Sequence, residues 1–144
     1  MTKRKLSRRS RLALGALSLS GLAIVYILQQ VNYFHFLFPL ETSTNITFIF
    51  NRTFRLLVND LLCVILIFVL FDEKKYVKMA YLVLTIELVV ILPLYFLIKL
   101  KMEGDAEISS PLLSQIHRLI VNPMLMFVLI AGFYYQRFLS AKNQ

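Results

Sequence analysis

Long apolar runs alternate with short polar segments along the chain, and this pattern predicts helices that cross a membrane. A transmembrane helix needs about 20 mostly apolar residues to cross a hydrocarbon core of ~30 Å. Four runs approach or exceed that length, at residues 12–31, 55–71, 76–98 and 119–136. Because these runs are continuously apolar, they indicate helices and not the alternating strands of a barrel. We therefore expect an all-α fold, a polytopic membrane protein with four transmembrane helices.

The composition agrees with a membrane protein and excludes several other classes. Hydrophobic residues make up 58% of the 144 positions, against about 45–50% in soluble domains. Charged residues make up 17%, where about 25% is usual. The single cysteine excludes a disulfide framework. We expect one membrane domain over residues 12–138, between a basic tail, residues 1–11, and a short tail, residues 139–144.

The positive charges predict how the helices are oriented. The net charge is +8, but six of the 16 Lys and Arg residues lie in the first eleven residues, as a tail and not as a folded surface for nucleic acid. With the N-terminus in the cytoplasm, eleven cations lie inside and five outside. Cytoplasmic segments carry such an excess of Lys and Arg, so both ends are predicted to be cytoplasmic. The run at 12–31 is too long for the core of a secretory signal, so we expect an uncleaved anchor.

The connections between the spans differ in length and character. The link Asp72–Lys75 is very short and forces an antiparallel hairpin, with Asp72 as the expected N-cap of the third helix. The segment Asn32–Phe54 is rich in aromatic residues, which favour the membrane–water interface. We expect this segment to lie on the membrane surface. A groove that contacts a substrate is the alternative.

Serine and proline mark the start of the last helix. Ser110 followed by Pro111 is typical of an N-cap and a first helical position. Apolar residues then recur at helical spacing, so the helix should begin as an amphipathic turn or two along the outer surface. Pro123 should bend the helix, because proline lacks a backbone donor and clashes with the preceding turn.

Two acidic residues interrupt the apolar spans. Asp60 lies in the second span, and Glu87 lies near the centre of the third. A charged side chain at mid-bilayer costs about 2.5–3.5 kcal/mol on insertion scales, and such groups usually face a partner or a cavity. Three roles remain open for them: a structural one, with the acid protonated or paired to a neighbouring helix; proton or cation handling; and contact with a partner membrane protein.

A short sequence occurs twice, at the start of the second and fourth spans. The pattern Arg-Leu-(Leu/Ile)-Val-Asn-x-(Leu/Met)-Leu occupies residues 55–62 and 118–125. In each copy the arginine and the asparagine are four residues apart and share a helix face. If the two helices pack side by side, Arg55 and Arg118 lie level at the outer boundary, with Asn59 and Asn122 one turn deeper. Two guanidinium groups there would suit a lipid head group or a carboxylate. Chance similarity and ordinary interfacial snorkelling are the alternatives.

The sequence offers little for catalysis. Cys63 lies deep in an apolar helix, and burial of that kind makes a thiol inert. His35 and His117 are isolated and belong to no metal-binding pair. Gly-rich phosphate loops and nucleophile elbows are absent. We therefore expect no enzyme, no catalytic residue, no metal site and no cofactor.

Several of these features occur together in one known family. Four spans in 144 residues combine with Arg55 and Asn59, with the turn Asp72–Lys75, and with a last helix that opens at residues 118–123 and ends in Phe133–Gln136. In this combination the chain resembles the exosortase F system-associated membrane proteins of Bacteroidota. The resemblance covers residues 52–136, whereas the first span and its loop match only in kind.

The resemblance implies a small bacterial inner-membrane protein associated with an exosortase, a membrane transpeptidase that processes proteins bearing a C-terminal sorting helix. Exosortases use a cysteine, an arginine and a histidine. Those roles are not transferred to this chain, because Cys63 is poorly placed and the helices are too few.

The leading hypothesis is therefore a non-enzymatic, multi-pass accessory protein of the bacterial cytoplasmic (inner) membrane. It would bind an exosortase or its sorting-signal substrate through its helices. Gly15, Ser18 and Gly21 of the first span would permit the close approach of a partner helix. Membrane lipids and another integral membrane protein are the expected partners.

Two further functions stay open. One is a small transporter or lipid-binding protein that uses Glu87 with Asp60 and Arg55 with Arg118. The other is a structural subunit of a larger envelope complex.

Overall fold

The structure is a computed structural model that describes residues 7–38, 42–102, 104 and 110–142. Within these ranges the chain forms helices and no strand. In chain order the helices are α1 (Arg8–Ile27), α2 (Tyr33–Leu37), α3 (Thr44–Phe71), α4 (Lys74–Ile86), η1 (Glu87–Ile91), α5 (Leu92–Met102), α6 (Pro111–Val121) and α7 (Met124–Lys142). Parts of the two expected tails, at residues 1–6 and 143–144, lie outside the described residues.

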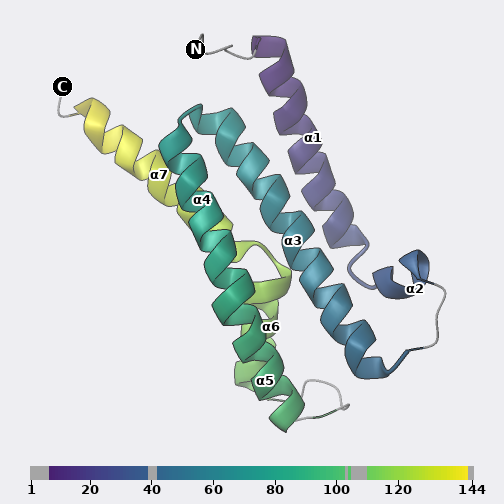
Figure 1. The fold of residues 1–144 in the computed structure, drawn as a ribbon. Helices are drawn as coiled ribbons and strands as arrows, with labels where there is room; N and C mark the ends of the chain where they lie inside the picture. The colour runs from purple at the N-terminus through teal and green to yellow at the C-terminus, as the bar shows by residue number, and fades with distance from the viewer. Residues whose placement is uncertain (1–6, 39–41, 103, 105–109, 143–144) are drawn as a thin grey trace.

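Four helical rods are long and apolar enough to span a membrane, which confirms the all-α polytopic fold. They are α1, α3, the continuous rod of α4, η1 and α5, and α7. Figure 1 shows α1 running antiparallel beside α3, with the α4–α5 rod on the other side of α3 and α6 next to α5. The start of α1 and the end of α7 lie at one end of the bundle, here named the terminal end, and α2 lies toward the opposite end, here named the α2 end. The cytoplasmic side stays a prediction of the charge distribution.

The helix that contains the second span begins well before the predicted start of that span. Helix α3 starts at Thr44, not near residue 55, and its 28 residues measure about 42 Å at 1.5 Å per residue. It therefore extends beyond a hydrocarbon core of ~30 Å. Residues 44–54 are thus helical and continuous with the second span, and α2 folds back onto the extended helix. Asn51 of α3 accepts a hydrogen bond from the backbone of Phe34 and donates one to Asn32, the N-cap of α2.

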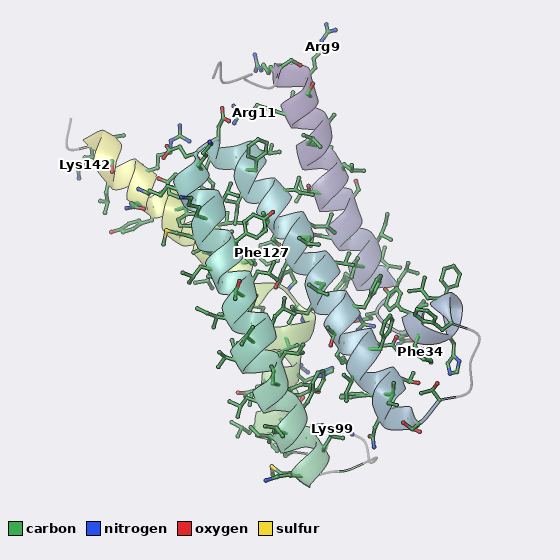
Figure 2. All side chains as sticks on the ribbon, viewed as in Figure 1. Arg9, Arg11, Phe34, Lys99, Phe127 and Lys142 are labelled. Atoms are coloured by element: carbon green, nitrogen blue, oxygen red, sulfur yellow. The ribbon has the colours of Figure 1, made fainter. Side chains whose placement is uncertain are left out.

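The hairpin between α3 and α4 is present, but Asp72 has a different role from the predicted one. Asp72 ends α3 in the left-handed conformation, with φ 55°, and Glu73 precedes α4. Aspartate tolerates this conformation better than most residues, so it suits a helix C-terminus. Arg11 of α1 forms an ion pair with Asp72 at 3.2 Å and donates to the carbonyl of Val69 at 2.6 Å. Figure 2 shows Arg11 at this end of the bundle and Lys99 at the other.

The last span is interrupted, whereas the sequence predicted only a bend. The predicted start is confirmed: Ser110 accepts a hydrogen bond from the Leu113 N–H, and Pro111 follows as the first helical residue. Helix α6 ends at Val121, Asn122 is extended (φ −102°, ψ 138°), and α7 begins at Met124. Proline disfavours the helical region for the residue before it, so Pro123 favours an extended conformation at Asn122.

The small residues of α1 pack against α3 of the same chain. Gly15 and Ser18 are buried, and the Ser18 hydroxyl donates to the Leu14 carbonyl. A Cβ atom on Gly21 would lie 3.0 Å from a methyl group of Leu62. This face of α1 therefore serves contact within the chain.

Candidate functional site

The two intramembrane acids meet each other. Asp60 of α3 and Glu87 of η1 are 1% and 3% exposed, and their carboxyl groups form a hydrogen bond. Two carboxylates without a proton offer acceptors only, so a hydrogen bond between them requires one proton. The Oδ2 atom of Asp60 and the Oε2 atom of Glu87 are buried without a hydrogen-bond partner among the described residues. The pair therefore joins the second and third spans with half of its oxygens unsatisfied.

The helix geometry changes at Glu87. It is the first residue of η1, where the Leu92 N–H donates to the carbonyl five residues earlier instead of four. Pro93 follows Leu92 and has no N–H to donate. The wider π-helical turn thus lies directly before a residue that cannot continue the regular ladder, and such turns often occur at functional sites.

Arg55 of α3 is buried near the α2 end of the bundle, where α3 meets the end of α1 and the start of α2. Its side chain is 4% exposed, and one terminal nitrogen, Nη2, donates to the backbone carbonyl of Gln29, just past the end of α1. The guanidinium carbon lies 5.8 Å from the centre of the Tyr33 ring. The Nε atom is buried without a hydrogen-bond partner in the described part of the chain. Arg55 is therefore fixed in place with one donor unused.

A cavity of about 380 Å³ lies beside Arg55, and we name it the Arg55 cavity. Its polar lining comes from Gln29, Arg55, Asn59 and Asn122. Its apolar lining comes from α1, from α7 and from the junction before α7: Leu22, Ala23, Val25, Tyr26, Pro123 and Phe127. Ligand pockets typically measure about 300–1,000 Å³ and combine apolar walls with a few polar groups. The Arg55 cavity has both properties.

The repeated sequence contributes three of its four arginine and asparagine residues to this cavity. Arg55 and Asn59 line it from α3, and Asn122 lines it from the junction between α6 and α7. Arg118 does not line the cavity, and its side chain is exposed near the end of α6. The break at Pro123 turns the second copy away from a straight helix, so the two arginines do not form a symmetric pair.

A second group of polar side chains lies between α5 and α6. The Tyr95 hydroxyl and the His117 Nδ1 atom are 2.8 Å apart and hydrogen-bonded. Burial, together with the positive charges of Arg52, Arg55 and Arg118, lowers the pKa of His117 to about 4. At neutral pH the imidazole is therefore uncharged. The charged residue that lines the Arg55 cavity is Arg55 itself.

Some of these residues had no signal in the sequence. Gln29 joins the site through its backbone carbonyl and its place after α1, which no residue pattern reveals. Pro93, by contrast, is visible in the third apolar run and could have indicated an irregular turn. Cys63 is fully buried in α3. Among the described residues, no three His, Cys, Asp or Glu side chains gather as metal ligands do.

Comparison with known proteins adds no assignment. No protein-family model, curated protein or solved structure matches this chain.

Proposed function

We propose that this protein binds the acidic group of another molecule of the membrane in the Arg55 cavity. The observation that carries the proposal is the buried guanidinium of Arg55, which lines a cavity together with two asparagine side chains. In the described ranges Arg55 has no ion pair with a carboxylate. A buried charge without a counter-charge is costly, and an acidic ligand would supply that counter-charge.

The chemistry of the lining fits a carboxylate or a phosphate. Arginine donates from a planar fork that matches both groups, and such charge-assisted hydrogen bonds are stronger than neutral ones. The Asn122 amide can donate to a further oxygen of the same group. The apolar walls would lie against the rest of the ligand. Binding of this kind requires no catalytic residue.

Replacement of Arg55 tests the proposal. With purified protein in a neutral detergent, octanoate and octyl phosphate should raise the unfolding temperature, and octanol should raise it less, because a ligand that binds the folded state stabilises it. Arg55→Gln should lower the affinity for both acids roughly ten- to hundredfold, the value of a hydrogen bond to a charged group. Arg55→Lys should cause a smaller loss, because it keeps the charge but loses the planar fork of donors.

Arg118→Gln is the matched control, since Arg118 occupies the equivalent place in the repeated sequence but lies outside the cavity lining. Its affinity for the acids should equal that of the unchanged protein. Equal losses in Arg55→Gln and Arg118→Gln would contradict the proposal, and so would equal stabilisation by octanol and octanoate.

We propose as a second candidate that the protein is an inner-membrane accessory of an exosortase, binding the enzyme or its sorting-signal substrate. The motifs that resemble the exosortase F system-associated proteins favour it, and two of them, at Arg55–Asn59 and at Asn122–Pro123, border the Arg55 cavity. Purification of the tagged chain in mild detergent from cells that contain an exosortase should then recover the enzyme. Recovery of the chain alone would count against this candidate.

A further inference from the structure

The polar and apolar linings of the Arg55 cavity lie at different depths. Helix α1 runs toward the α2 end, so Gln29 is nearer that end than Leu22 and Ala23. Helix α3 runs the other way from its start at the α2 end, and Asn59 lies one turn deeper than Arg55. After the junction at Asn122, Phe127 lies about one turn further into α7.

In all three chain segments, therefore, the lining of the cavity is polar near the α2 end and becomes apolar deeper in the bundle. The charged end of the cavity is level with the end of α1, where the 20 residues of that helix have crossed about 30 Å, the thickness of a hydrocarbon core. The apolar end points toward the middle of the bilayer. A membrane lipid has the same order, with its acidic head at the interface and its chain in the core.

The cavity volume limits how much of a lipid it encloses. An engineered cavity of about 150 Å³ holds one benzene ring, so about 380 Å³ holds an acidic head and a short length of chain. The remainder of a long chain must therefore lie in the bilayer. The chain would pass between α1 and α7. These two helices are the least buried of the four, since only 6% and 11% of the residues in their most apolar stretches lie inside the protein.

We propose that the occupant of the Arg55 cavity is a lipid with an acidic head group, which enters sideways from the bilayer. Its head contacts Arg55, and the first part of its chain lies against Ala23 and Phe127. This inference rests on the proposed function, since it names the class of molecule that carries the acidic group. Fatty-acid carboxylate and lipid phosphate share the required chemistry.

The test compares a change at the apolar end with a change at the charged end. The full chain is placed in phosphocholine nanodiscs that contain oleate or phosphatidate, and the bound lipid is counted by native mass spectrometry. Arg55→Gln should lose both lipids. Ala23→Phe fills the apolar end with a larger side chain, so it should lose oleate and phosphatidate roughly tenfold but leave the binding of butyrate and inorganic phosphate unchanged.

Ala131→Phe is the matched control, because Ala131 is exposed on α7 and does not line the cavity. It should retain both lipids. Phe127→Trp fills the same end of the cavity from another helix, and it replaces Ala23→Phe if that variant does not fold.

The outcomes separate the two claims. Unchanged oleate and phosphatidate binding in Ala23→Phe and Phe127→Trp, with loss in Arg55→Gln, would overturn the lipid and leave the acid site intact. Loss of lipid in Ala131→Phe as well would overturn the lipid assignment, since the effect would not depend on the cavity. Equal retention of lipid in Arg55→Gln would overturn both claims. If the unchanged protein binds oleate and not phosphatidate, the acidic head is a carboxylate. If it binds phosphatidate and not oleate, the head is a phosphate.

Discussion

Glu87→Leu is expected to lower the free energy of unfolding by about 1–3 kcal/mol, the cost of leaving a buried polar group without its partner. Asp60 is 1% exposed, and its carboxyl group forms a hydrogen bond with that of Glu87. Leucine cannot replace this bond, so the Asp60 carboxyl would remain buried in an apolar bundle. The measurement is unfolding of the purified protein in mixed micelles, followed by helicity.

Two companion variants separate the hydrogen bond from the volume of the side chain. Glu87→Gln should cost much less than Glu87→Leu, because its amide can donate to the Asp60 carboxyl. The double variant Asp60→Leu with Glu87→Leu should recover much of the loss, since replacement of both buried partners by apolar groups is often nearly neutral. If Glu87→Leu proved as stable as Glu87→Gln, the pair would not contribute to the packing of α3 against η1.

Gly21→Phe is expected to destabilise the contact between α1 and α3 by about 1–3 kcal/mol, as overpacking does in other cores. The first added carbon would already lie 3.0 Å from Leu62, and a ring needs more room than that side chain can release. The unfolding temperature in micelles is the measurement. Because α1 also forms a wall of the Arg55 cavity, acid binding should weaken in the same variant.

The chain contains a matched control for this change. A Cβ atom on Gly132 of α7 would meet nothing within 4 Å, so Gly132→Phe should change stability by less than about 0.5 kcal/mol. The double variant Gly21→Phe with Leu62→Ala should recover part of the loss, because the smaller side chain leaves space for the ring. Equal destabilisation by Gly21→Phe and Gly132→Phe would contradict the packing of α1 on α3.

The start of the last predicted helix could be read from the sequence, whereas its interruption at Asn122 could not. Ser110 and Pro111 act locally, through a side-chain hydrogen bond and a fixed backbone angle, so their positions in the sequence are sufficient. Whether Pro123 bends or breaks the helix depends on contacts beyond the local sequence. The break at Asn122 is accompanied by the contacts of α6 with α5 and of α7 with α4.

The start of α3 shows the same difference. Residues 44–54 mix aromatic and polar side chains, and this composition predicted a surface segment. The helix nevertheless continues through them, and α2 packs on it: Asn51 holds α2 by two hydrogen bonds, and Phe50 packs on Phe34 with ring centres 5.4 Å apart. Such contacts join residues far apart in the chain, so their partners could not be read from a local window.

The sequence identified most polar residues of the candidate site, but it did not predict which of them contact each other. Asp60, Glu87, Arg55, Asn59 and Asn122 all stood out as polar groups in apolar runs. The sequence left open what each of them faces. The structure pairs the two acids with each other, places Arg55 against the carbonyl of Gln29, and leaves Arg118 outside the cavity.

The four membrane-crossing rods were determined by the sequence alone, because the transfer of a helix into hydrocarbon depends on the number of consecutive apolar residues and on little else. Only the tertiary structure decided which polar side chains share a space. That choice depends on the rotation of each helix about its own axis and on its height relative to its neighbours. Close contacts such as Gly21 against Leu62 fix both quantities, and they form between residues that the chain keeps far apart.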